Sequence, residues 1–162
     1  MKPSLEEIRG WLEEVPDPEI PVVSVVDLGV VRGIDWRGEE LVVGVTPTYS
    51  GCPATAVIAL EIAETLKRRG LENVRVETLL SPPWTTAWIS KAGREKLKAY
   101  GVAPPVEGAS CAGALKPVSA LVECPRCGSS KTERVSQFGS TPCKASYRCK
   151  DCLEPFDYFK SF

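Results

Sequence analysis

Apolar residues recur at helical spacing in three segments of the N-terminal part of the chain. The first segment begins with Ser4-Leu-Glu-Glu7, a capping-box pattern in which each polar side chain can bond the backbone N–H of the other residue. It ends before Pro18, because proline disfavours the helical region at the preceding residue. The other two segments cover residues 53–69 and 90–100. The sequence therefore predicts three helices, and the first two have a clear apolar face to bury.

Three further segments in the same part of the chain have the composition of β-strands. Residues 30–36 and 41–46 are rich in valine and are joined by Arg37-Gly-Glu-Glu40, which predicts a hairpin. Residues 74–80 add a third strand, in which valines alternate with charged residues. The order α-β-β-α-β-α is typical of an α+β fold, a small sheet with helices on one face.

Aromatic residues divide the chain into two parts. All four tryptophans lie within residues 1–88, and all four phenylalanines lie after residue 137. Between them runs Ala103-Pro-Pro-Val-Glu-Gly-Ala-Ser-Cys-Ala-Gly-Ala, a linker-like composition whose Cys111 has no assigned role. The predicted organisation is a larger domain over residues 1–103, a linker over residues 104–120 and a small module over residues 121–162.

The small module carries two CxxC pairs, Cys124-Pro-Arg-Cys127 and Cys149-Lys-Asp-Cys152, with 21 residues between them. Each pair can place two thiolates on one side of a tight turn, so the two pairs can surround one metal ion tetrahedrally. The chain contains no histidine, so a four-thiolate site is the only standard structural zinc site open to it. The spacing lies just beyond the usual range for a zinc ribbon. Short strands are predicted over residues 132–138, 144–148 and 156–160.

Metal binding would provide folding free energy that the module lacks. A segment of 42 residues rarely buries enough apolar surface to fold without a metal, disulfides or a partner. A structural zinc contributes on the order of 10 kcal/mol or more. Four thiolates leave no open position, which favours a structural Zn²⁺, with rubredoxin-like iron as the alternative. Cys143 lacks a CxxC partner and is interpreted as a buried or spare thiol.

Cys52 is a separate candidate for chemistry, in the segment Thr46-Pro-Thr-Tyr-Ser-Gly-Cys-Pro-Ala. It comes directly before Pro53, at the predicted start of a helix. Free backbone N–H groups and the helix dipole favour the thiolate form there. The thiol can be a soft nucleophile or metal ligand, or an inert cysteine that packs as a small hydrophobe. Its spacing alone favours neither reading.

Several function classes are excluded by what the sequence lacks. Without histidine the chain cannot be a Cys-His protease, a Ser-His-Asp hydrolase or a histidine-ligated metal enzyme, and it has no common nucleotide-binding loop. The net charge is −1, and the module's seven basic and five acidic residues are balanced by a doubly negative zinc–tetrathiolate centre, so nucleic-acid binding is not expected. No apolar run could span a membrane and the acidic N-terminus is not a signal peptide, which predicts a cytoplasmic protein. Three carboxylates are interpreted as solvated loop charges: Asp17, Glu19 and Asp27.

Four segments of the larger domain match the motifs of a known family. They are Asp17-Pro-Glu-Ile-Pro-Val, Val26-Asp-Leu-Gly-Val-Val, Thr46-Pro-Thr-Tyr-Ser-Gly-Cys-Pro-Ala and Leu80-Ser-Pro-Pro-Trp-Thr-Thr. In this order they resemble the MIP18 (DUF59) family, which includes proteins of iron–sulfur cluster assembly and transfer. The resemblance implies a MIP18-like α+β fold and a transient iron–sulfur cluster or iron at Cys52. It also implies that Asp17, Glu19 and Trp84 lie near that thiol.

The C-terminal module extends the resemblance to one branch of that family, PaaD (also called PaaJ). Three segments carry it: Cys124-Pro-Arg-Cys-Gly, Phe138-Gly-Ser-Thr-Pro-Cys-Lys-Ala and Glu154-Pro-Phe-Asp-Tyr-Phe-Lys. The branch contains the D subunits of bacterial phenylacetyl-CoA epoxidase complexes. The resemblance implies an accessory subunit in aerobic phenylacetate degradation that assists maturation of iron–sulfur or di-iron centres, with the oxygenase and reductase subunits as partners. Catalysis by the chain alone is not expected, and the resemblance leaves open a purely structural docking role and homo-oligomerisation.

Overall fold

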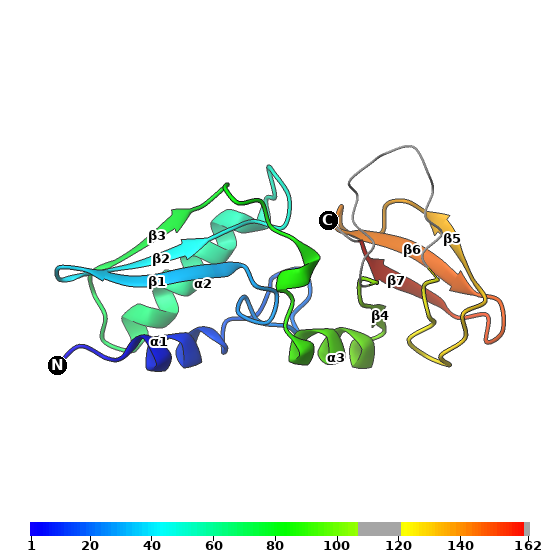
Figure 1. Cartoon of the computed structure of the whole chain (residues 1–162), viewed down its shortest axis with the longest axis horizontal. Helices are drawn as coiled ribbons and strands as arrows, with labels where there is room; N and C mark the ends of the chain where they lie inside the picture. Colours follow the sequence, from blue (N-terminus) through cyan, green and yellow to red (C-terminus); the bar gives the residue numbers. More distant parts are fainter. Residues whose placement is uncertain (107–120, 161–162) are drawn as a thin grey trace. The chain divides into compact units, whose positions relative to one another are not determined.

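The structure of the chain, a computed structural model, describes residues 1–106 and 121–160 (Figure 1). The chain divides into two compact units, of which the first comprises Met1–Trp84 and Trp88–Gly93 and the second Thr85–Ala87 and Arg94–Phe162. Cys111 lies outside the described residues. Within the described part of the chain, no helix has the length and apolar character needed to cross a bilayer.

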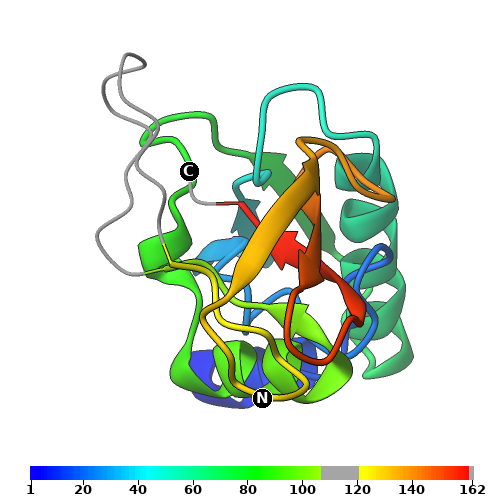
Figure 2. The ribbon, with the colours of Figure 1, turned by 90° about the vertical axis from the view of Figure 1, so that its right-hand side faces the viewer.

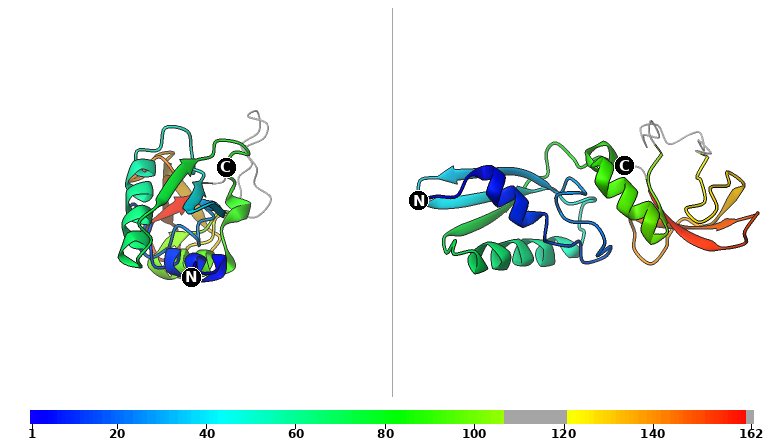
Figure 3. Two further views of the ribbon diagram at one scale, coloured as in Figure 1. Left: turned by 90° about the vertical axis from the view of Figure 1, so that its left-hand side faces the viewer. Right: turned by 90° about the horizontal axis from the view of Figure 1, so that it is seen from below.

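The first unit contains two helices that pack on each other, α1 (Leu5–Leu12) and α2 (Ala54–Arg68). The right-hand view of Figure 3 shows both helices from below. The predicted capping box is present, because Glu7 N–H donates to Ser4 Oγ at 3.2 Å and Ser4 N–H donates to Glu7 Oε2 at 2.8 Å. Both helices bury an apolar stripe as predicted, although Leu5 of α1 is 44% exposed and α1 ends well before Pro18. The buried apolar residues of the stripes are Ile8, Leu12, Ala54, Ile58, Ile62 and Leu66.

The sheet of the first unit has the strand order β1-β2-β3. Its strands are β1 (Val31–Arg37), β2 (Glu40–Val45) and β3 (Val74–Thr78). β1 and β2 form the predicted antiparallel hairpin, and β3 joins β2 in parallel after the α2 crossover. Leu41, Val43 and Val45 alternate along β2 and are fully buried. α1 contacts β1 and α2 contacts β3, so the two helices cover this apolar face and the α+β prediction is confirmed.

Charged side chains lie on the opposite face of the sheet. Arg37 forms a bidentate pair with Glu77 at 3.0 and 3.2 Å, and Arg75 bonds Glu77 at 2.5 Å and lies 3.7 Å from Glu40. Val42, which shares this face with Arg75, is only 4% exposed. Burial raises the pKa of Glu77, but the two guanidinium groups outweigh it and lower that pKa overall. This face of the sheet is therefore a network of ion pairs beside the buried Val42.

The second unit contains a sheet with the strand order β4-β7-β6-β5 (Figure 2). Its strands are β4 (Val102–Ala103), β5 (Thr132–Ser136), β6 (Lys144–Cys149) and β7 (Pro155–Phe159). The last three match the predicted ribbon strands to within two residues. The core of the unit is small and includes two of the four CxxC cysteines. Its buried members are Ala103, Val122, Cys124, Ala145, Cys149, Phe156 and Tyr158.

β4 has no counterpart among the predicted elements. Val102 and Ala103 pair in parallel with Asp157 and Tyr158 of β7, so a segment that precedes the linker completes the ribbon sheet. The division into units accordingly places residues 94–103 in the second unit, whereas the sequence puts a boundary after residue 103. A strand of two residues has no periodicity from which it could be predicted.

The third helix, α3 (Lys91–Tyr100), follows a short 3-10 helix, η1 (Thr86–Trp88). Ser90 Oγ accepts the N–H of Gly93 at 2.9 Å, as an N-cap residue does. At the other end Gly101 adopts a φ of +94°, and the guanidinium of Arg126 lies 3.0 Å from where a Cβ of Gly101 would stand. The first CxxC turn is therefore packed on the residue that ends α3.

Candidate metal centre and thiol loop

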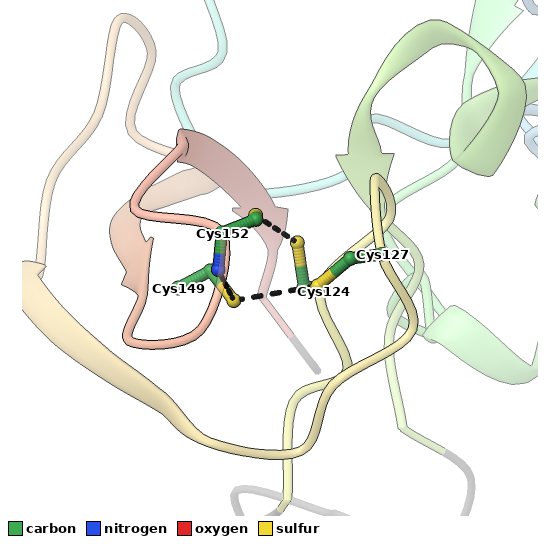
Figure 4. Close-up of side chains that lie close together, drawn as sticks. All are labelled: Cys124, Cys127, Cys149 and Cys152. Atoms are coloured by element: carbon green, nitrogen blue, oxygen red, sulfur yellow. Dashed lines mark hydrogen bonds between the residues drawn. The ribbon is translucent and has the colours of Figure 1, made fainter.

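Four cysteine sulfurs of the second unit form one cluster (Figure 4). The Sγ atoms of Cys124, Cys127, Cys149 and Cys152 all lie within 4.8 Å of one another. The shortest separations join the two CxxC turns, 3.7 Å between Cys124 and Cys152 and 3.5 Å between Cys127 and Cys149. A tetrahedral zinc with Zn–S bonds of about 2.3 Å holds its sulfurs about 3.8 Å apart. The cluster therefore has the size and the donor set of a four-thiolate metal site, with ligands from the segment before β5 and from the end of β6.

The two CxxC turns have the same backbone construction. In each, the N–H of the first cysteine donates to the carbonyl oxygen five residues later, at 2.9 Å in the first turn and 3.0 Å in the second. In each, the residue after the second cysteine has a positive φ, +76° at Gly128 and +64° at Leu153. Glycine adopts this conformation freely, whereas leucine is strained in it. The second turn thus achieves the same geometry with an unfavourable residue.

Four thiols at this distance cannot all ionise without a cation. Hydrogen bonding by the N–H of Cys152, partly opposed by burial, lowers the pKa of Cys149 to about 7. The N–H of Glu154 lowers the pKa of Cys152, but burial and the three neighbouring sulfurs outweigh it and raise the pKa to about 12. Cys149 is therefore the first thiolate that a metal would meet, and a bound cation would have to displace the proton of Cys152.

Replacing Leu153 by glycine should stabilise the second unit by about 1 kcal/mol, because the left-handed conformation costs a leucine more than the extra chain entropy of glycine costs. The measurement is thermal unfolding of the metal-loaded chain, followed through amide NMR signals of β5 to β7. Leu153→Ala is the matched control, since it removes the 60% exposed side chain but keeps the strain. An equal gain in both variants would contradict the strain argument.

Cys52 lies in the thiol loop, residues 46–53, which connects β2 to α2. Its N–H donates to the carbonyl oxygen of Tyr49 at 3.3 Å, and its own carbonyl accepts the N–H of Thr55 at 3.2 Å. Pro53 is the N-cap of α2 and makes no side-chain capping bond, so the helix begins one residue later than the sequence predicts. Cys52 as a residue is half-buried.

The register of the sheet brings three family motifs to one end of the first unit. Val31 opposes Val45 across β1 and β2, and Val45 opposes Thr78 across β2 and β3. β1 begins at this end, whereas β2 and β3 finish there. The segment before β1, the thiol loop after β2 and the segment after β3 therefore all meet this end of the sheet, with the latter two in cyan and green in Figure 1.

Asp17 and Trp84, which the resemblance places near Cys52, each bond the backbone of a family motif. Asp17 is buried, and its Oδ1 accepts the N–H groups of Glu19 at 2.9 Å and Ile20 at 2.8 Å. The indole N–H of buried Trp84 donates to the carbonyl oxygen of Leu28 at 2.8 Å. The interpretation of Asp17 as a solvated loop charge was wrong, because its carboxylate organises a turn.

Asp27 is also buried, which contradicts its interpretation as a solvated charge. Its Oδ2 accepts the N–H of Ser24 at 3.1 Å, and Ser24 Oγ accepts the N–H of Asp27 at 3.0 Å. Ser90 Oγ lies 3.3 Å from Asp27 Oδ1, and the N–H of Ser90 donates to the carbonyl oxygen of Asp27 at 2.8 Å. The Ser24-x-x-Asp27 spacing resembles a capping box and could have signalled the local turn, but nothing local signals its partner 63 residues away.

Cys143 is buried and lies outside the four-sulfur cluster. Its Sγ is 3.0 Å from Thr141 Oγ1 in the turn before β6. This placement agrees with a buried thiol that is not a ligand.

Comparison with known proteins gives matches to both units. Residues 5–78 match the family of iron–sulfur cluster assembly proteins, and residues 110–160 match the PaaD zinc β-ribbon domain. A protein of Escherichia coli (strain K12) named as the D subunit of 1,2-phenylacetyl-CoA epoxidase is 50% identical over 158 residues, which cover 98% of this chain and 93% of the relative.

Solved structures share the fold of the first unit. A DUF59 domain from Bacillus anthracis matches with a TM-score of 0.53 and 26% identity, over 57% of this chain and 89% of that domain. A conserved hypothetical protein from Thermotoga maritima matches with a TM-score of 0.50 and 34% identity, over 59% and 95% of the two chains. The predicted resemblance is thus confirmed in both parts of the sequence. The chain belongs to the PaaD family, in which an iron–sulfur cluster assembly (DUF59) domain is followed by a zinc β-ribbon.

Proposed function

We propose that the chain is an accessory subunit of phenylacetyl-CoA epoxidase that assists assembly of an iron–sulfur or di-iron centre in that complex. The observation that carries the proposal is the position of Cys52, a half-buried thiol at the end of the sheet where the family motifs meet. It is the only cysteine in the first 110 residues. The domain that holds it matches iron–sulfur cluster assembly proteins, and cysteine thiolates are the usual ligands of iron–sulfur clusters.

In this proposal Cys52 acts as a transient ligand. Its Sγ takes the place of one thiolate ligand of iron that belongs to the protein delivering the cluster. The proton of the Cys52 thiol passes to water or to the departing thiolate. Transfer to the acceptor is the reverse exchange, so no oxidant or reductant is required. Asp17 and Trp84 act as positioning residues, because Asp17 holds the backbone of its own motif and Trp84 holds that of the motif at residues 26–31. Glu19 is half-buried in the turn that Asp17 organises.

The ribbon cysteines have a structural role in the same proposal. Cys124, Cys127, Cys149 and Cys152 would hold Zn²⁺, which supplies folding free energy and no catalytic position. If the site holds zinc rather than iron, the purified protein is expected to be colourless and to contain about one zinc per chain. A red protein with charge-transfer bands would instead indicate iron.

A second candidate function is a docking subunit in which Cys52 is inert. The observation that favours it is the exposed apolar surface of the ribbon, where Val135 is 66% and Phe138 is 63% exposed. The partners in both candidate functions are the oxygenase and reductase subunits, and both functions are compatible with a cytoplasmic complex.

Replacing Cys52 by serine distinguishes the two functions. We expect the loaded fraction of the iron–sulfur cluster in the assembled complex to fall at least about tenfold, since loss of even an outer-shell partner of a metal ligand costs that much in affinity. The measurement is iron and acid-labile sulfide per complex after anaerobic purification from cells that carry the variant. Zinc is counted in the same samples.

Cys143→Ser is the matched control, because it removes a cysteine that lies outside the sulfur cluster. It should leave both iron and zinc contents unchanged. Full cluster loading with Cys52→Ser would reject the maturation role and favour docking.

A further inference from the structure

Strand β1 carries one residue more than its partner strand, and that residue is Arg32. Val31 opposes Val45 and Gly33 opposes Gly44, so Arg32 has no opposite residue on β2. A bulge of this kind takes a side chain out of the regular alternation of the strand, and bulges are frequent beside functional sites. This bulge lies at the end of the sheet where the thiol loop begins.

The guanidinium of Arg32 lies flat against an aromatic ring. Its Cζ is 3.6 Å from the ring centroid of Trp88. Trp88 is held close to the backbone at Gly29, where an added Cβ would be 2.5 Å from the Trp88 carbonyl oxygen. Stacking fixes the plane of the guanidinium but uses none of its in-plane N–H donors. Among residues 1–106 and 121–160 no hydrogen bond of this guanidinium is found, so the site is an oriented cation whose donors are open.

Arg32 differs in its pairing from the other arginines of the same sheet. Arg37 and Arg75 both pair with Glu77. Arg32 is exposed and makes no ion pair within residues 1–106 and 121–160. An ordered guanidinium with free parallel donors matches a planar anion such as a carboxylate, which it can bind through two hydrogen bonds.

Exposed apolar side chains at the same end of the sheet favour a protein over a small anion. Leu79 and Leu80 follow β3 directly and are 37% and 67% exposed. Leu79 lies over Gly44, where its Cδ1 is 2.6 Å from the position of an added Cβ. Apolar contact bordered by a charged side chain is the anatomy of a protein–protein interface, whereas a free phosphate would gain nothing from the leucines.

We propose that Arg32, stacked on Trp88, is a docking point for an acidic side chain of a partner protein. The carboxylate would accept two hydrogen bonds from the guanidinium, and Leu79 and Leu80 would pack on apolar residues beside it. Docking here would bring the partner to the end of the sheet that carries Cys52. The inference rests on the proposed function only for the identity of the partner, an oxygenase or reductase subunit of the epoxidase.

The experiment measures association of the full chain with each purified epoxidase subunit by calorimetry, at low and at high NaCl. We expect Arg32→Gln to weaken the association with one subunit roughly tenfold at low salt and to reduce its salt dependence. Arg32→Lys should recover only a minor part of the affinity, because an ammonium group neither stacks nor presents parallel donors. Arg9→Gln removes another exposed arginine of the first unit and should change the affinity less than about twofold.

Four results would overturn the proposal. The first three are equal affinities of Arg32→Gln and Arg9→Gln, full rescue by lysine, and no association of the wild type with either subunit. A fourth is Arg32-dependent binding of inorganic phosphate at the affinity of the protein partner, which would indicate a general anion site. A failure of this proposal can be told apart from a failure of the proposed function. Cys52→Ser should lower the iron–sulfur cluster content of the complex but leave the affinity of the chain for the subunit unchanged. Loss of association in Arg32→Gln together with full loading in Cys52→Ser would reject the maturation role alone.

Discussion

Replacing Cys149 by serine is expected to unfold the second unit and abolish metal binding, while the first unit stays folded. Cys149 is fully buried, belongs to the small core of the ribbon and supplies one corner of the sulfur cluster. Removing one ligand loses most of the folding free energy that metal binding supplies, which is on the order of 10 kcal/mol for structural zinc. The few buried residues of this core cannot compensate for a loss of that size.

The distribution of aromatic residues makes this result easy to measure. All four tryptophans belong to the first unit. Tryptophan fluorescence should therefore keep its native emission in Cys149→Ser, while the NMR signals of β5, β6 and β7 collapse to those of an unfolded chain. Cys143→Ser is the control, and it should retain one metal per chain. A folded ribbon in Cys149→Ser, or in the wild type after exhaustive chelation, would disprove the metal's structural role.

The same site should bind its metal less tightly as the pH falls. Binding requires four thiolates, so protons compete with the cation. Cys149, with a pKa lowered to about 7, gives up its proton readily near neutrality, whereas Cys152, with a pKa raised to about 12, yields its proton only to the metal. Chelator competition at several pH values would record this dependence.

Replacing Gly29 by alanine is the second change with a large expected effect, a destabilisation of the first unit by about 3 kcal/mol or more. Gly29 has a φ of +69°, a conformation that costs an L-residue about 1–2 kcal/mol. An alanine Cβ would also stand 2.5 Å from the carbonyl oxygen and 2.7 Å from the Cβ of Trp88. Relief of such a clash by backbone movement typically costs a further 1–3 kcal/mol, roughly.

Gly38→Ala separates the two contributions. Gly38 sits in the hairpin turn with a φ of +61°, but no atom lies within 4 Å of its added Cβ. This variant should therefore show only the conformational cost, about 1 kcal/mol. Urea unfolding followed by tryptophan fluorescence measures both variants. Equal destabilisation at the two glycines would contradict the packing argument.

The sequence predicted the elements whose evidence is local. Helical stripes, the capping box at Ser4 and the hairpin at Arg37-Gly-Glu-Glu40 all appear where their patterns indicate, because each depends on neighbours within a few residues. The four-cysteine cluster was predictable for the same reason, since each CxxC pair forms one turn. β4 was not, because it exists only through its pairing with β7, more than 50 residues away.

The roles of the charged residues near the thiol loop could not be predicted from the sequence. In the sequence Asp27 is indistinguishable from a solvated acidic loop residue. In the folded chain it is buried beside Ser90 and its carboxylate accepts hydrogen bonds. Arg32 occupies an ordinary polar position of a strand. Only the register with β2 identifies it as the bulged residue, and only the tertiary fold places Trp88 beneath it. The sequence shows where charged residues stand, whereas the group that each one contacts is set by the tertiary fold.

The pairing of β4 with β7 changes which residues belong to the ribbon. Its sheet takes one edge strand from before residue 107 and the other three from after residue 120, so the linker is an internal connection of the second unit. A break in the covalent chain within residues 107–120 would therefore leave the two fragments joined through the sheet. A fragment cut to residues 121–162 would instead expose the backbone edge of β7 and the side of the core that Ala103 covers. The smallest portable form of the ribbon therefore begins upstream of the linker, at the residues of β4.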